Sequence, residues 1–189
     1  MNAPLRKPMS LEEFLDWEQR QELRYEFDGF APVAMTGGTF EHAIIQANLI
    51  RALGNRLHGR PCRVVGSELK IAVAGGIRYP DAFVVCSPVP RGARVVEEPV
   101  AVFEILSHST AVTDRVVKNR EYRDTPSIRR YVMLEQFRPA ATVFERMGDD
   151  WVGHVLESPA TLPMPEIGIE LPLPEIYEGV QFPETLEDD

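Results

Sequence analysis

The stretch Tyr79–Cys86 reads YPDAFVVC, and a second apolar run, Val100–Leu106, reads VAVFEIL. Both runs offer apolar side chains to both faces of a strand, which is typical of central strands in a sheet. Each run carries one acid, Asp81 near the start of the first and Glu104 inside the second. A buried carboxylate is costly unless a counterion accompanies it. The two runs therefore predict a central sheet with a pair of acids that calls for a cation.

Helices and further strands are expected on both sides of these runs. Ser10 and Glu13 form a capping-box pattern that opens a short helix, and Asp28-Gly29 marks a hairpin turn. The patterns predict helices over residues 10–20, 39–58 and 111–124, and strands over residues 23–27, 31–35, 63–73, 79–86, 100–106, 130–134 and 140–144. This order predicts an α/β fold in which helices flank a mixed central sheet, with an added N-terminal helix and hairpin.

The long helix over residues 39–58 is expected to bury one apolar stripe. Its apolar positions recur at spacings of three and four residues, as one face of a helix requires, and they are Phe40, Ile44, Ala47, Ile50, Leu53 and Leu57. Gly59 and Pro61 are expected to end it. The turn at Gly75-Gly76 lacks the lysine of a phosphate-binding loop and is interpreted as a hairpin turn.

The C-terminal quarter is acidic and rich in proline. Residues 139–189 hold twelve acids against one base, so residues 1–138 carry a formal charge of +2 although the whole chain carries −9. Six of the 16 prolines fall in residues 157–183, which predicts an irregular wrap with Leu171–Tyr177 docked on the core. We expect one domain over residues 1–183 and a frayed acidic tail, 184–189, directed away from the paired acids.

Composition excludes several classes of protein. With 44% hydrophobic and 26% charged residues, the chain is neither wholly disordered nor fibrous. No apolar run reaches the roughly 18 residues of a membrane span, and no secretory signal precedes Ser10. Cys62 and Cys86 each lie in an apolar stretch and are expected to be reduced core thiols of a cytoplasmic protein, with a disulfide or a reactive site as the alternatives.

Lys118 is the third residue that points to chemistry. A helix is expected over residues 111–124, after Glu104. Its residues Asp114, Lys118 and Tyr122 are spaced by four residues and therefore share one face. A lysine above two metal-bound carboxylates could hold a water or stabilise charge that develops on a phosphate. The ordinary alternatives are a turn cap for Asp81, an arginine partner for Glu104 and a surface salt bridge between Lys118 and Asp114.

The sequence also resembles a known family over Leu11 to about Tyr177. The motifs that carry the resemblance appear in a fixed order: Tyr25-Glu26-Phe27-Asp28-Gly29, His42, Tyr79-Pro80-Asp81, Phe103-Glu104-Ile105-Leu106-Ser107-His108-Ser109-Thr110, and Asp114 with Lys118 and Tyr122. Together they are similar to the Uma2 family, also called DUF820, of restriction-endonuclease-like proteins. The resemblance implies the PD-(D/E)XK nuclease fold and Mg²⁺-dependent cleavage of a phosphodiester, with Mn²⁺ as the alternative metal.

Site residues follow from this resemblance. Asp81 matches the first acid and Glu104 the second, and the metal would be held by Asp81, Glu104 and the backbone carbonyl of Ile105. The superfamily lysine would fall at position 106, where this chain has leucine, so Lys118 is expected to take its role. Glu26 and His42 match family positions at the edge of the site, Glu26 as an extra metal ligand or base. Their ordinary alternatives are a hairpin surface charge and a polar residue at a helix N-terminus.

The expected substrate is DNA. Phosphate contacts are assigned to Arg115, Arg120 and Arg123, with Arg129, Arg130 and Lys118 as further basic residues, although a solvated helix face explains the same charges. Two other functions share the scaffold: a non-catalytic interaction or regulatory protein, and a metal-dependent hydrolase of a small phosphate ester. The sequence leaves the oligomeric state open between a monomer and a homodimer.

Other catalytic chemistries find no support in the residue pattern. The histidines at positions 58, 108 and 154 show no zinc-binding spacing with one another or with the cysteines. His108 follows Glu104 closely and could face the site, but a loop residue is the simpler interpretation. Ser107, Ser109 and Thr110 are interpreted as helix caps because no nucleophile elbow surrounds them.

Overall fold

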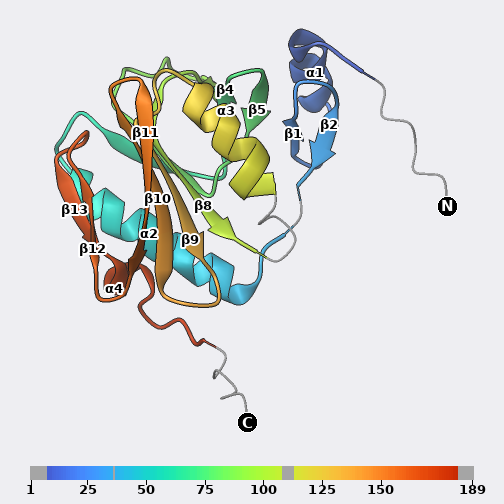
Figure 1. Ribbon diagram of the computed structural model, residues 1–189. Coiled ribbons are helices and arrows are strands. Elements are labelled where there is room, and N and C mark those ends of the chain that lie inside the picture. The colour runs from blue at the N-terminus through green and yellow to red at the C-terminus, as the bar shows by residue number, and fades with distance from the viewer. Residues whose placement is uncertain (1–7, 36, 108–112, 183–189) are drawn as a thin grey trace.

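A six-stranded sheet forms the centre of the computed structural model, which describes residues 8–35, 37–107 and 113–182 (Figure 1). Its strand order is β11-β10-β9-β8-β6-β3. The strands are β3 (Arg63–Gly66), β6 (Ala82–Val85), β8 (Pro99–Leu106), β9 (Arg130–Glu135), β10 (Ala140–Met147) and β11 (Asp150–Glu157). β8 pairs in parallel with β9 and antiparallel with β6, so the two acid-bearing runs are neighbouring central strands, as predicted.

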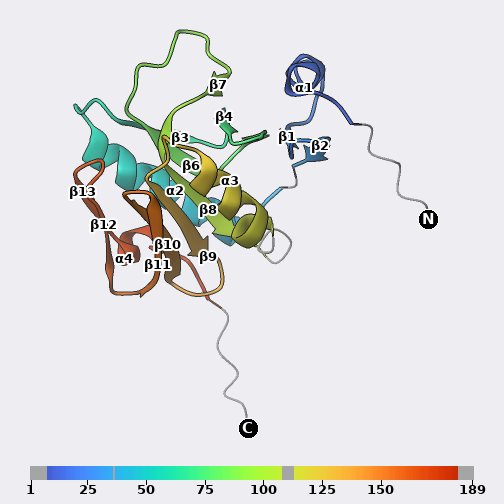
Figure 2. The same cartoon turned by 45° about the horizontal axis from the view of Figure 1, so that its top comes forward.

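A second sheet joins the N-terminal hairpin to the rest of the chain. Its order is β2-β1-β5-β4-β7, and its strands are β1 (Tyr25–Phe27), β2 (Pro32–Ala34), β4 (Lys70–Val73), β5 (Gly76–Arg78) and β7 (Val95–Val96). Helix α1 (Leu11–Glu18) lies with β1 and β2 at one side of the molecule (Figure 2). Gly76 allows the β1–β5 pairing, because a Cβ there would stand 2.6 Å from the carbonyl oxygen of Phe27.

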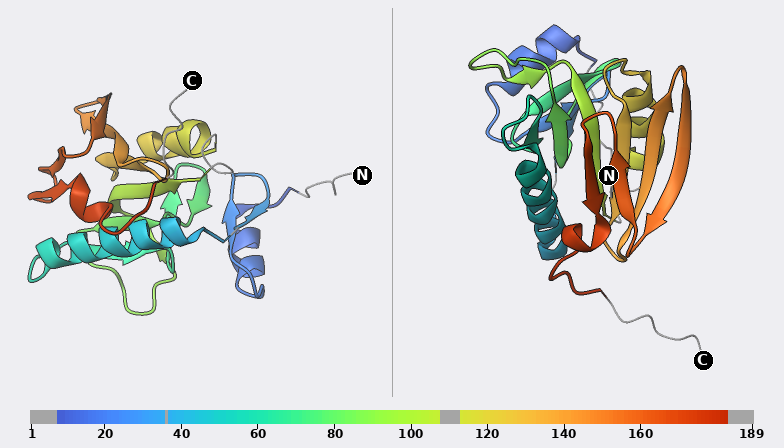
Figure 3. Two further views of the ribbon diagram at one scale, coloured as in Figure 1. Left: turned by 90° about the horizontal axis from the view of Figure 1, so that it is seen from below. Right: turned by 90° about the vertical axis from the view of Figure 1, so that its left-hand side faces the viewer.

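Two long connections cover opposite faces of the central sheet (Figure 3). On one face lies α2 (Phe40–Leu57), and on the other lie the π-helical turn η1 (Thr113–Lys118) and α3 (Asn119–Asp124). The crossover through η1 and α3 is what allows β8 and β9 to run parallel, since parallel neighbours cannot be joined by a tight turn. The expected helix over residues 111–124 is therefore two elements, and its first two residues lie outside the described ones.

The predicted stripe on α2 is only partly correct. Leu53 and Leu57 are buried, but Phe40 is 75% exposed and Ala47 is exposed as well. The buried positions are Ile45, Leu49, Ala52, Leu53 and Leu57, which pack against β6, β8 and β9. Ile44 belongs to the predicted stripe and its neighbour Ile45 to the stripe that is buried. Both stripes fit a period of 3.6 residues, and packing on the sheet decides between them.

The expected strand over residues 63–73 is wrong as a single element. A turn at residues 67–69 divides it into β3, in the central sheet, and β4, in the second sheet. Apolar residues lie on both sides of the turn, at residues 64–65 and 71–73, and the same apolar character is expected whichever sheet a strand joins. Hydrophobic periodicity therefore does not reveal that the chain changes sheets there.

The C-terminal segment is more regular than its proline content predicts. Strands β12 (Thr161–Met164) and β13 (Ile169–Pro172) form a hairpin, and the short helix α4 (Leu173–Ile176) follows. Leu171, Leu173 and Ile176 are fully buried, which confirms that this end of the chain docks on the core. The prediction of an irregular wrap over 157–183 is wrong, because the described prolines fit into regular elements and turns: Pro159 and Pro165 lie in turns, Pro163 and Pro172 in β12 and β13, and Pro174 in α4. The acidic residues 184–189 lie outside the described residues.

The prediction of two reduced thiols is also wrong. Cys62 and Cys86 form a disulfide, with their Cα atoms 3.9 Å apart. Arg63 and Val85 are partners in the β3–β6 register, so the two cysteines just beyond them face each other across the strand pair. The strand register depends on the tertiary structure, and the separation of 24 residues between the two cysteines does not predict it.

No helix in the described part of the chain is long and apolar enough to cross a bilayer.

Candidate active site

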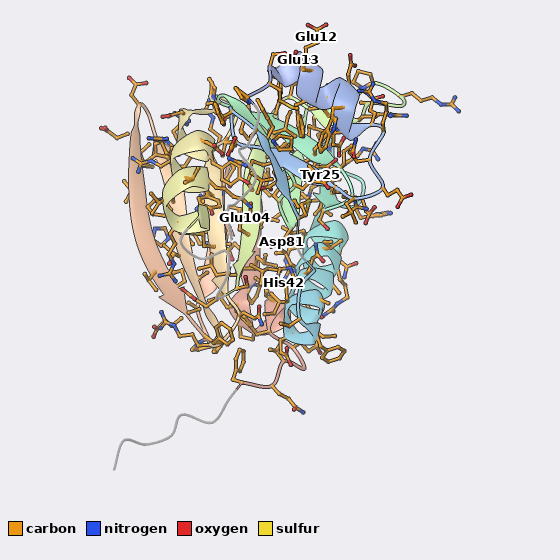
Figure 4. All side chains as sticks on the ribbon, turned by 90° about the vertical axis from the view of Figure 1, so that its right-hand side faces the viewer. Glu12, Glu13, Tyr25, His42, Asp81 and Glu104 are labelled. Atoms are coloured by element: carbon orange, nitrogen blue, oxygen red, sulfur yellow. A yellow bond between two sulfur atoms is a disulfide. The ribbon has the colours of Figure 1, made fainter. Side chains whose placement is uncertain are left out.

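Asp81 lies where β6 begins, directly beside β8. Ala82 pairs with Phe103 in the antiparallel register, so Asp81 and Glu104 occupy the next position along the two strands. The Oδ2 atom of Asp81 accepts a hydrogen bond of 2.6 Å from the backbone N–H of Ile105. Figure 4 shows the side chains of Asp81, Glu104 and His42 near one another on one side of the molecule. The structure thus brings together the two acids that the sequence assigned to one site.

Glu104 is buried inside β8 but is satisfied by two residues of the crossover. Its Oε1 atom accepts hydrogen bonds of 3.0 Å from the Lys118 ammonium and 2.6 Å from the Tyr122 hydroxyl. Burial raises the pKa of Tyr122 well above its ordinary value, and the neighbouring Glu104 charge raises it further. Tyr122 therefore stays a protonated donor. The arginine partner considered for Glu104 is replaced by a lysine and a tyrosine.

Glu26 reaches the same cluster from β1. It is only 8% exposed, and its Oε1 atom lies 3.4 Å from the Lys118 ammonium and accepts a 3.0 Å hydrogen bond from the backbone N–H of Tyr79. The alternative of a hairpin surface charge is therefore wrong. The ammonium of Lys118 lies within ion-pair distance of both Glu26 and Glu104, while the side chain of Asp114 lies outside the described ones.

Arg78, at the end of β5, connects Glu26 to Glu121 of α3. Its guanidinium makes two hydrogen bonds, of 2.7 and 2.6 Å, to the Glu121 carboxylate and lies 3.4 Å from Glu26. Burial alone would lower the pKa of Arg78, but the hydrogen bonds to Glu121 and the charges of both glutamates outweigh it, and the pKa is raised. Arg78 stays charged and holds β1 and α3 at a fixed separation.

His42 and Gln46 hold Asp81 from the first turns of α2. The Nε2 atom of His42 lies 2.9 Å from Oδ1 of Asp81, and the Gln46 amide donates a 2.8 Å hydrogen bond to the backbone carbonyl of Asp81. The backbone N–H of His42 donates a hydrogen bond to the side-chain hydroxyl of Thr39, which is the N-cap residue of α2. Sequence analysis missed Gln46 and Arg78. Gln46 lies four residues after His42 on the same helix face, a spacing that could have identified it.

The oxygen atoms at Asp81 and Glu104 are ligands that suit a hard divalent cation. Within residues 8–35, 37–107 and 113–182, no three histidine, cysteine or acidic side chains form a complete cation site. Mg²⁺ does not require one, because it usually takes one or two carboxylates, keeps several waters and completes its shell with substrate phosphate. Each oxygen of Asp81 accepts one hydrogen bond from the described residues, which leaves it a second lone pair for a metal. Asp81, Glu104 and the Ile105 carbonyl are thus compatible with such an ion.

The arginines assigned to phosphate contacts are not equivalent. Arg115, Arg120 and Arg123 are exposed on η1 and α3, and Arg115 pairs with Glu135 at 2.7 Å. Arg130, by contrast, is 1% exposed and bonded to Glu145 and Glu166, so its expected phosphate contact is wrong. Lys118 is likewise buried in the acidic cluster. His108 lies outside the described residues.

Removing the Tyr122 hydroxyl should destabilise the fold. We expect Tyr122→Phe to lower the free energy of unfolding by about 1–3 kcal/mol, because the buried Glu104 carboxylate loses one of its hydrogen-bond donors. Urea unfolding measures the change. Tyr25→Phe is the matched control, since the Tyr25 hydroxyl makes no hydrogen bond to the part of the chain that the structure describes. An equal loss in both variants would contradict the assigned role of Tyr122.

The chain is similar in sequence to several known proteins. The sequence profile of the Uma2 family, described as "Putative restriction endonuclease", matches residues 11–174. The chain is 31% identical to "Uncharacterized protein slr1290" of Synechocystis sp. over 185 residues, covering 96% of this chain and 97% of that protein. It is 25% identical to "Uncharacterized protein sll1609" of the same organism over 148 residues, covering 76% and 84% respectively.

A solved structure shares the fold. The crystal structure of a putative nuclease belonging to DUF820 from Anabaena variabilis superposes with a TM-score of 0.73. The match covers 90% of this chain and 98% of the other at 20% sequence identity. The mixed sheet flanked by helices is therefore the fold of that protein as well.

Proposed function

This chain belongs to the Uma2 family, and from that membership and the paired acids we propose that it is a divalent-metal-dependent DNA endonuclease. One observation carries the proposal: Asp81, directly before β6, lies at the position opposite Glu104 of β8, and a buried lysine bonds to Glu104. Lys118 pairs with Glu104 and Glu26, so its ion pairs do not account for Asp81. A second acid at the adjoining strand position is what a site for a cation and a phosphate requires.

In this proposal the metal, preferably Mg²⁺, is held by Asp81, Glu104 and the carbonyl of Ile105. The ion would supply Lewis-acid polarisation of the phosphate and activation of a water molecule. The N–H of Ile105 and the Nε2 atom of His42 fix the two oxygens of Asp81, so this carboxylate is oriented before any ligand binds. Pre-orientation of this kind reduces the entropy lost when the substrate is positioned.

Lys118 supplies positive charge next to Glu104. We assign it to the stabilisation of negative charge on the phosphate as the bond to the leaving oxygen breaks. Glu26 and Tyr122 hold the lysine and Glu104 in place from two different elements, β1 and α3. Glu26 acts here through Lys118, because its own oxygens already contact Lys118, Arg78 and the backbone of Tyr79.

Nicking of supercoiled plasmid tests the proposed function directly. We expect the protein with Mg²⁺ or Mn²⁺ to convert supercoiled DNA to open circles, and EDTA to abolish the conversion, because two carboxylates without a cation would repel the phosphate. Gel electrophoresis measures the product. Hydrolysis of a small phosphate ester without any nicking would favour the alternative hydrolase, and inactivity on both substrates would favour a non-catalytic role.

A further inference from the structure

A surface groove of about 630 Å³ follows the outer side of η1 and α3. Its walls carry four arginines, Arg115, Arg120, Arg123 and Arg146, together with two aspartates and Trp151. Four bases against two acids give this groove a formal charge of +2, in a chain whose total is −9. A concave positive surface on an acidic protein attracts anionic ligands, because its walls focus the field.

Two of the four arginines are available to a ligand. Arg146 donates to the backbone carbonyls of Ile128, Arg123 and Thr125, and Arg115 is paired with Glu135. Arg120 and Arg123 are exposed, and neither forms an ion pair with any residue that the structure describes. These two guanidinium groups can therefore bind phosphate without first breaking an internal salt bridge.

Trp151 supports the inner wall of the groove. The Arg146 guanidinium lies over its ring at 4.6 Å, and the Arg123 guanidinium lies 6.0 Å from the ring centres of both Trp151 and Phe144. Cation–π attraction reaches about 6 Å from the ring centroid, and it leaves the N–H groups of the guanidinium available to other ligands. Arg123 thus lies at the limit of this range from two rings at once, which favours a position of its guanidinium beside the groove wall.

The groove begins close to the paired acids. Arg115 contacts Glu135, and Glu135 is the β9 partner of Leu106, two residues after Glu104. Lys118 and Tyr122 face Glu104 from the inner side of the same crossover. From Arg115 to Arg123 the helical segment rises on the order of 10 Å, which corresponds to about three phosphates of one strand at 3.4 Å spacing.

We propose that this groove binds the sugar–phosphate backbone that flanks the scissile bond, with Arg120 and Arg123 as the phosphate contacts. The inference rests on the proposed function and adds the path that the nucleic acid takes from Asp81 and Glu104 along the outer side of α3. The contacts are made to the backbone, so they add affinity without sequence preference.

Charge reversal in the groove tests this path. The double variant Arg120→Glu/Arg123→Glu is compared with Arg51→Glu/Arg138→Glu, whose arginines are also exposed but lie away from the groove. Each double change makes the formal charge more negative by four, so a general charge effect is matched. Affinity for a labelled 20-base-pair duplex is measured by fluorescence anisotropy in EDTA across a salt series, so that binding is read without cleavage.

We expect the groove variant to bind at least about 10-fold more weakly at low salt and the control about 2-fold more weakly. Loss of two phosphate contacts should reduce the salt slope by about 1.8, at 0.9 for each contact. Equal losses in both variants, or no binding by the unmodified protein, would overturn the proposal. Tighter binding of poly-glutamate than of DNA, lost in the groove variant, would overturn it in favour of an acidic protein partner.

Plasmid nicking by the same variants separates this inference from the proposed function. Asp81→Asn should bind the duplex with unchanged or slightly higher affinity, although it cannot nick. If the unmodified protein binds DNA through Arg120 and Arg123 but never nicks it, the endonuclease proposal is wrong and the proposed DNA-binding groove stands. If the double variant Arg120→Glu/Arg123→Glu nicks DNA normally, the proposed DNA-binding groove is wrong and the endonuclease proposal stands.

Discussion

Replacing Asp81 by Asn is expected to abolish metal-dependent nicking while the protein remains folded. Asparagine has the same volume and can still accept the N–H of Ile105, but it removes the negative charge that a cation needs. Loss of several kcal/mol of metal-dependent stabilisation corresponds to a fall in rate of roughly 1,000-fold. Initial nicking rates at saturating Mg²⁺ measure the effect.

Asp16→Asn provides the matched control, because Asp16 is an exposed residue of α1 and undergoes the same loss of charge. Its nicking rate should equal that of the unmodified protein. Glu104→Gln should resemble Asp81→Asn in activity but should also lower stability, since Lys118 would then lose a charged partner in a buried site. Unchanged nicking by Asp81→Asn would disprove the assignment of the active site.

Replacing Arg78 by Met is expected to have the largest effect on stability. Arg78 is 2% exposed and compensates the carboxylates of Glu26 and Glu121, which would both stay buried. Removal of one partner from a buried ion pair costs about 3–5 kcal/mol, which lowers the melting temperature by on the order of 10 °C in a chain of this size. Thermal and urea unfolding followed by circular dichroism measure the change.

Arg51→Met is the control for Arg78→Met. Arg51 pairs with Glu178 at 2.6 Å, but both side chains are exposed, and exposed pairs contribute about 0–1 kcal/mol. Addition of Glu121→Gln to Arg78→Met should recover part of the lost stability, because it removes one of the stranded charges. Equal destabilisation by the Arg51 and Arg78 variants would contradict the structural role given to Arg78.

The two central strands and their acids could be predicted because the signal is local. Continuous apolar runs identify β6 and β8, and a carboxylate within such a run is conspicuous at Asp81 and Glu104. The capping box of Ser10 and Glu13, which opens α1, could be predicted for the same reason, and the start of α2 near Thr39 was predicted as well. Each of these features depends on residues a few positions apart.

Partners in the site could not be predicted in the same way. Glu26 contacts Lys118, and Arg78 contacts Glu121, across 43 or more residues of sequence. Alternatives such as a surface role for Glu26 or phosphate binding by Arg130 were equally consistent with the sequence. Burial decided between them, because a charge that is removed from water must take a partner wherever the fold provides one.

The sequence alone determined the mixed α/β class, the order of the acidic strands and the candidate acids, since apolar periodicity and caps are local properties of the chain. Only the tertiary structure decided which stripe of α2 is buried, that β3 and β4 belong to different sheets, and that Cys62 meets Cys86. The physical reason is strand register. A shift of one residue changes which side chains face each other, and register is fixed by packing across the whole sheet rather than by neighbouring residues.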